Sequence, residues 1–141
     1  MKILLAVDGS KHTRRSARFL AAHIADFARP PTVHVLYVHA PIPYAGAASR
    51  LGRKAIEDYQ KEDSEVALAV ARKELTTKGI AFQATWRVGD VAREIAACVK
   101  ENGIDLLVMG SHGHGALGNL VLGSVATKVI ATTKVPVLIV R

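Results

Sequence analysis

The sequence has one cysteine, Cys98, and only three Phe, three Tyr and one Trp. A single cysteine excludes an internal disulfide and any cysteine-rich metal site. No apolar run approaches the ~18 residues that a membrane-spanning helix needs. The apolar start of the chain is broken by Asp8, which makes it too short for a secretory signal. We therefore expect a cytoplasmic protein in which Cys98 is a buried structural thiol rather than a redox sensor.

Acidic residues are missing from the last quarter of the chain. From Leu106 to Arg141 there are three basic residues and no acid. Between Lys11 and Lys54 there are eight basic residues and one acid, and the net charge of the chain is +7. A solvated surface is the simplest interpretation of this basic cluster, and an anionic partner is the alternative. Nucleic acid is not the expected partner, because interleaved aromatic residues and a known motif are lacking.

What the sequence has is enough apolar residues for a core. Half of its 141 residues are hydrophobic, which fits one domain over residues 1–141. Continuous apolar runs, typical of buried strands, alternate with stripes of helical spacing. We expect strands at 3–7, 33–38, 80–88, 105–109 and 135–140. We expect a first helix on the apolar stripe Ala17-Leu20-Ile24-Phe27 and a last helix on the stripe Val121-Val125-Val129. A third helix is expected over 91–102, where Asp90 caps its start. The longest helix is expected over Arg53–Thr77, with an inward face formed by Ile56, Tyr59, Val66, Val70 and Leu75.

This alternation predicts a doubly wound α/β fold with parallel strands and right-handed crossovers. Ligands of such folds bind beyond the carboxyl ends of the strands, where the strand order reverses. That edge should bring together Asp8–Ser10, Val38–His39 and Met109–Gly113. A binding site is therefore expected there.

The segment from Gly110 to Ser124 is rich in glycine and leads into a helix. Glycine lets backbone N–H groups approach a phosphate, and a helix N-terminus adds a positive dipole. A flexible surface loop is the alternative interpretation. A dinucleotide site is not expected at Gly113-x-Gly115-x-x-Gly118, because the acid required ~20 residues later is lacking. A P-loop is not expected at Gly118-x4-Gly123-Ser124, because serine stands where a P-loop needs lysine. Neither class of nucleotide enzyme is supported.

A third pattern, Gly110-x2-Gly113-x9-Gly123-Ser124, resembles the glycine motif of the ATP-binding universal stress proteins. The opening Ile3–Ser10, the segment Asp105–Ser111 and the close Val135–Val140 are similar to the same family, so the resemblance covers the whole chain. It implies a five-stranded parallel sheet of order 3-2-1-4-5 with helices on both faces. It also implies a homodimer paired through Val135–Val140.

The resemblance implies ligand contacts position by position. Asp8 would lie beside the adenine, and the main chain of Val38 would contact it. Gly110 would approach the ribose, and the phosphates would lie at Gly113, Gly123, Ser124 and the Val125 amide. A Mg²⁺ ion bound with ATP would depend on phosphates, water and hydroxyls. The residues expected to bind ATP are thus Asp8, Val38, Met109, Gly110, Gly113, Gly123, Ser124 and Val125.

Two kinds of residue at this edge have a second interpretation. Asp8 has the position of a helix cap as well as of an adenine contact. His39, His112 and His114 are expected to converge there. Donation to a phosphate is favoured over zinc binding for them, because no Cys or Glu joins the three.

The function implied by the resemblance is that of a stress-response protein that binds ATP as a regulatory or sensor module. The alternative is a weak ATPase or a phosphotransferase that modifies itself at Ser124 or a loop hydroxyl. That alternative needs a base to orient water or activate a hydroxyl, and the glycine segment contributes no carboxylate. No catalytic residue is assigned.

Overall fold

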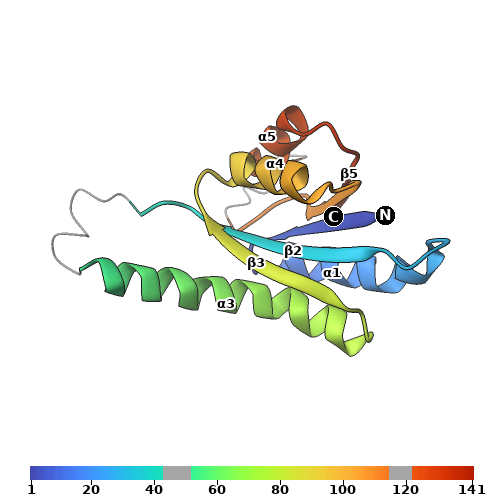
Figure 1. Ribbon diagram of the computed structural model, residues 1–141, viewed down its shortest axis with the longest axis horizontal. Helices are drawn as coiled ribbons and strands as arrows, with labels where there is room; N and C mark the ends of the chain where they lie inside the picture. Colours follow the sequence, from blue (N-terminus) through green and yellow to red (C-terminus); the bar gives the residue numbers. More distant parts are fainter. Residues whose placement is uncertain (43–51, 115–121) are drawn as a thin grey trace.

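The structure, a computed structural model, describes residues 1–42, 52–114 and 122–141 (Figure 1). Five strands form one parallel sheet in the order β3-β2-β1-β4-β5. The predicted five-stranded α/β sheet is confirmed. The strands are β1 (Lys2–Val7), β2 (Thr32–His39), β3 (Phe82–Val88), β4 (Leu106–Gly110) and β5 (Val137–Val140).

Helices cover both faces of the sheet. The helices α1 (Lys11–His23) and α3 (Arg53–Thr77) lie on one face, and α4 (Val91–Asn102) and α5 (Ser124–Thr132) lie on the other (Figure 1). Ile3, Leu5 and Val7 belong to the core under α1 and α3, whereas Leu4 and Ala6 belong to the core under α4. Burial on both faces explains why β1 is a continuous apolar run.

Local signals define most helix ends. Ser10 begins α1, because its side chain accepts from the N–H groups of His12 and Thr13. Asp90 caps α4 by accepting from the Arg93 N–H, and Gly103 ends that helix in the left-handed conformation. Cys98 lies buried on the inner stripe of α4, as predicted, and burial raises the pKa of its thiol.

The first predicted helix is too long. The helix α1 ends at His23, and a 3₁₀ turn, η1 (Ile24–Asp26), follows it. Ile24 and Phe27 still pack against the core under α1 and α3, but Phe27 has extended backbone. The helical spacing of these residues therefore identified core contacts without identifying the end of the helix.

The predicted inner face of α3 is partly wrong. Ile56 and Leu75 are buried as expected, but Tyr59 is 55% exposed and Val66 is 67% exposed. The face that packs inward carries the large apolar residues Ile56, Leu68 and Leu75 together with four small or polar residues, namely Gln60, Ser64, Ala67 and Ala71. Small residues are needed there because α3 approaches the turn after β1 closely. A Cβ on Gly9 would lie only 2.9 Å from the Cα of Ala67.

Both edge strands are shorter than predicted. The strand β3 begins at Phe82 rather than Ile80, and β5 begins at Val137 rather than Val135. Pro136 has no N–H to donate, although its carbonyl accepts from the Leu107 N–H at 3.0 Å. Val121, predicted to lie on the last helix, is outside the described residues. In the portions of the chain that are described, no helix has the length and apolar character needed to cross a membrane.

Candidate functional site

A cavity of about 540 Å³ lies at the carboxyl ends of β1, β2 and β4. This is the position at which the strand order reverses on either side of β1, as predicted for a ligand site. The cavity brings together all eight residues expected to contact a nucleotide. They are Asp8, Val38, Met109, Gly110, Gly113, Gly123, Ser124 and Val125.

One part of the lining is apolar. Val38 and Ala40 come from the end of β2, Val91 and Ile95 come from α4, and Met109 comes from β4. Ligand pockets are commonly lined by apolar side chains with a few polar groups that fix orientation. This part of the cavity can therefore accept a flat, largely apolar ring.

A second part of the lining is the N-terminus of α5. Gly123 is the residue before the helix and offers no side chain to cap it, and the first turn contains no acid. The first N–H groups of a helix have no partner within the helix and carry its positive dipole end. Because Ser124 and Val125 line the cavity, these donors face a space in which an anion can bind.

The Asp8 carboxylate is held by the turn that follows β1. Its Oδ1 atom accepts from the Ser10 N–H at 2.9 Å and from the Thr13 hydroxyl at 2.8 Å. The cap of α1 is Ser10, so Asp8 orders the turn before the helix rather than capping the helix itself. Its Oδ2 atom lies against Gly113, where an added Cβ would be only 2.5 Å away.

The histidines separate into two groups. His112 and His114 line the cavity, and the Nε2 of His114 lies 2.8 Å from the Asp8 carbonyl oxygen. His39 is not part of the lining, so the expected convergence of three histidines is wrong for this residue. Its Nδ1 lies 2.6 Å from the Ala40 carbonyl, and its Nε2 lies 3.5 Å from Asp63 on α3. Among the residues that the structure describes, no group of three His, Cys, Asp or Glu is arranged to hold a metal ion.

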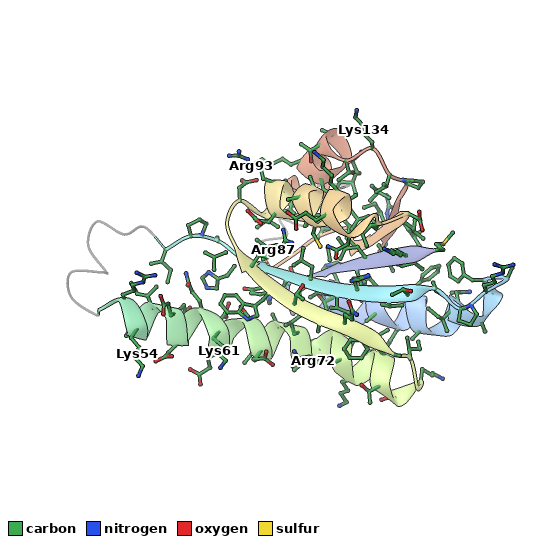
Figure 2. All side chains as sticks on the ribbon, viewed as in Figure 1. Lys54, Lys61, Arg72, Arg87, Arg93 and Lys134 are labelled. Carbon is green, nitrogen blue, oxygen red and sulfur yellow. The ribbon has the colours of Figure 1, made fainter. Side chains whose placement is uncertain are left out.

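In the described part of the chain, the basic side chains lie outside the cavity. Figure 2 shows Lys54 and Lys61 pointing away from the sheet on α3, and Arg93 and Lys134 at the outside of the α4 and α5 layer. Arg14 and Arg18 are exposed and contact Glu74. The described lining includes no Lys or Arg. A negative ligand in this cavity would therefore be bound by backbone N–H groups, hydroxyls and imidazoles.

The whole chain, residues 1–141, matches the model of the universal stress protein family. The chain belongs to this family. It is 36% identical over 140 residues to a universal stress protein of Thermus aquaticus, covering 99% of this chain and 97% of that protein.

Solved structures of the family share the fold. Protein MJ0577, from Methanocaldococcus jannaschii, aligns with a TM-score of 0.83 at 26% identity, covering 99% of this chain and 94% of that one. The universal stress protein of Archaeoglobus fulgidus, solved in complex with dAMP, aligns with a TM-score of 0.64 at 27% identity, covering 100% of this chain and 98% of that one.

This universal stress protein also has residues in or directly behind the cavity lining that the sequence motifs did not identify. His12 is 8% exposed, its ring centroid lies 5.5 Å from that of His112, and a Cβ on Gly110 would lie 2.7 Å from its Cβ. Burial, reinforced by the charges of Lys11 and His112, lowers the pKa of His12. Gly110 is thus required by the packing of α1, in addition to lining the cavity.

Tyr37 is a second residue missed by the motifs. It lines the cavity, and its hydroxyl donates to Asp63 on α3 at 2.7 Å. Burial and this hydrogen bond raise the pKa of Tyr37, so its phenol is neutral. Only its position one residue before Val38 at the end of a strand could have placed it near the site.

Proposed function

We propose that this chain is a cytoplasmic stress-response protein that binds ATP in this cavity and changes its affinity for a partner with nucleotide occupancy. The observation that carries the proposal is that an apolar lining and an uncapped helix N-terminus share one cavity of about 540 Å³. Typical small-molecule sites measure ~300–1,000 Å³. The complex of the Archaeoglobus fulgidus relative with dAMP supports an adenine nucleotide as the ligand.

The proposed pose has the adenine between the apolar residues of β2 and α4. The phosphates lie at the start of α5, where the Ser124 hydroxyl and the Val125 N–H donate to them. A phosphate directly at Gly113 would meet the Asp8 carboxylate. The phosphate chain is therefore expected at Gly123–Val125, and Asp8 is expected to face a donor group of the nucleoside.

A Mg²⁺ ion is proposed to enter with the ATP. Magnesium prefers oxygen ligands and retains water, so phosphate oxygens and water would supply most of its coordination. Asp8 is the one carboxylate among the described lining residues. Because its Oδ2 atom faces the nucleoside in the proposed pose, the protein's contribution to the ion would come from hydroxyls near the phosphates, such as that of Ser124.

Nucleotide binding is tested on the purified protein. Denaturation followed by anion-exchange chromatography identifies any nucleotide that co-purifies, and titration with ATP, ADP and AMP gives the affinities. The absence of both a bound nucleotide and micromolar ATP binding would overturn the proposal. Incubation with labelled ATP and Mg²⁺ tests the catalytic alternative, for which phosphate release or labelling lost in Ser124→Ala is the positive result.

A homodimer through β5 is part of the proposal. The Leu107 N–H donates to the Pro136 carbonyl and the Ser111 N–H donates to the Val140 carbonyl. Because backbone direction alternates along a strand, Val137 and Ile139 present their N–H and C=O groups to the outer edge of the sheet. No described strand pairs with that edge. A second copy of this short apolar strand can pair with it.

The variant Ile139→Pro tests this dimer selectively. Proline removes the outward N–H of residue 139 and leaves the bonds between β4 and β5 in place. Ile139→Ala is the matched control for the lost side chain. Sedimentation should give a dimer for the native protein and for Ile139→Ala, and a monomer for Ile139→Pro. A monomeric native protein would overturn this part of the proposal.

A further inference from the structure

We infer that Thr13 is a positioning residue for the nucleotide site, whose hydroxyl fixes the Asp8 carboxylate so that Oδ2 accepts a hydrogen bond from a donor group of the ligand. The inference rests on the proposed function, since it assigns a role within the same cavity. Thr13 lies in the first turn of α1 and outside the glycine motif. It lines the cavity but is only 2% exposed.

The Thr13 hydroxyl makes three hydrogen bonds with the turn after β1. It donates to Asp8 Oδ1 at 2.8 Å, and it accepts from the N–H groups of Asp8 at 2.9 Å and Gly9 at 3.1 Å. The Ser10 N–H also donates to Oδ1, at 2.9 Å. These contacts fix both the backbone and the side chain of Asp8.

The second carboxylate oxygen is left for the ligand. No residue in the described part of the chain donates a hydrogen bond to Asp8 Oδ2, which lies against the backbone of Gly113. The described cavity lining has no Lys or Arg to pair with this charge. A charged acceptor in a cavity is satisfied by a donor, so a ligand hydroxyl or amino group fits this position.

The hydroxyl of Thr13 is not needed to begin α1. Ser10 caps that helix by accepting from the backbone N–H groups of His12 and Thr13, which valine, serine or alanine at position 13 would retain. Removing only the hydroxyl should therefore release Asp8 without removing the helix cap. A carboxylate that is held in one orientation before binding loses less conformational freedom when the ligand arrives.

The first test is the ATP affinity of Thr13→Val, which has nearly the same shape without the hydroxyl, and of Thr13→Ser, which retains it. We expect binding about tenfold weaker in Thr13→Val and within about threefold of native in Thr13→Ser. Thr77→Val, which removes a hydroxyl at the distant end of α3, is the matched control and should bind as the native protein does. If Thr13→Val does not fold by circular dichroism, Thr13→Ala replaces it.

The second test is a double-mutant cycle with Asp8→Ala. If Thr13 acts through Asp8, Thr13→Val has no further effect on ATP affinity once Asp8 is absent. A merely structural role would weaken binding by the same factor in both backgrounds, and that additivity would overturn the inference. Native affinity in folded Thr13→Val would overturn it as well. A native protein that binds no nucleotide would overturn the proposed function and this inference together.

Discussion

The Oδ2 atom of the Asp8 carboxylate occupies the space next to Gly113 that a side chain would need, since a Cβ there would lie 2.5 Å from this oxygen. The two residues are far apart in the sequence, at the carboxyl ends of the adjacent strands β1 and β4. Glycine at position 113 is therefore explained by the presence of a carboxylate. The same contact places a negative charge beside part of the glycine motif.

Gly113→Ala should weaken ATP binding by displacing Asp8 or the loop after β4. We expect a loss of about tenfold in affinity, with about 1 kcal/mol lost in the free energy of unfolding. Titration and urea unfolding measure the two quantities. In an Asp8→Ala background the added methyl group has space, so Gly113→Ala should then cost almost nothing in stability. An equal cost in both backgrounds would contradict this explanation.

Gly123→Val should abolish ATP binding while the sheet stays folded. The backbone of Gly123 has φ −69°, which any residue can adopt, so backbone strain is not the reason. A Cβ would lie 3.3 Å from both the Cα of His112 and the carbonyl oxygen of Ser111, so a branched side chain would crowd the loop after β4 that lines the cavity.

Ser124→Ala is the milder variant at the same helix start. It should cost roughly 1–2 kcal/mol of binding free energy if its hydroxyl donates to a charged phosphate. ATP titration with parallel thermal melting measures both variants. If Gly123 is only a helix-start glycine, its substitution changes the melting temperature without a specific loss of binding.

Gly9→Ala should be more destabilising than Gly79→Ala. Both glycines have positive φ, at 80° and 67°, which disfavours an L side chain by ~1–2 kcal/mol. A Cβ on Gly9 would also lie 2.9 Å from the Cα of Ala67, whereas nothing lies within 4 Å of one on Gly79. Urea unfolding measures the loss in the free energy of unfolding for each variant. Gly79→Ala should show the cost of backbone strain alone, and Gly9→Ala should show that cost plus the cost of steric overlap. Equal losses would show that α3 moves away from the turn at no cost.

Stability should fall as the pH is lowered below about 6.5. Burial lowers the pKa of His34, with help from the charge of Lys2, and burial also lowers the pKa of His12. In the unfolded chain each imidazole has its ordinary pKa of ~6.5, whereas in the folded protein the pKa of each is lower. The unfolded state thus binds more protons below pH 6.5, so stability is lost between that pH and the lower pKa of the folded state.

His34→Leu isolates one of these two contributions. The Nε2 atom of His34 is buried and has no hydrogen-bond partner among the described residues, so leucine removes a polar atom as well as a titrating group. Urea unfolding between pH 7.5 and 5 should show a smaller loss of stability in the variant than in the native protein. An unchanged pH dependence would contradict the assignment to His34.

The sheet could be predicted from the sequence because its central strands are continuous apolar runs. The strand β1 is covered on both faces, so its burial is visible in every residue from Ile3 to Val7. The cavity could be located because parallel strands end at one edge, and the glycine spacing identified residues that line it. The α/β class and the ligand-binding edge follow from the pattern of the chain, whereas the strand order and the individual contact residues follow from the resemblance of its motifs to the family.

Other features depend on contacts between distant segments and left no such pattern. The inner face of α3 was misassigned because a small residue, Ala67, packs closely against Gly9 in the turn after β1. The apolar pattern of α3 does not show this contact with a distant segment. His39 turns toward Asp63 on α3 rather than toward the cavity. Thr13 and His12 look like ordinary residues of a first helical turn until Asp8 and Gly110 are placed beside them.

Because β1 is the central strand, the part of the cavity lined by β1 is rigid, whereas the surrounding turns and helix end, called here the rim, adapt more easily. Both edges of β1 are hydrogen-bonded to neighbouring strands and both of its faces are covered, so Ala6 and Val7 lie in the part of the fold that opens least readily. Asp8, His114 and the start of α5 lie where strands give way to turns and to a helix end. Amide hydrogen exchange beneath the ligand should therefore report global unfolding, whereas slower exchange caused by a bound nucleotide should be confined to the rim.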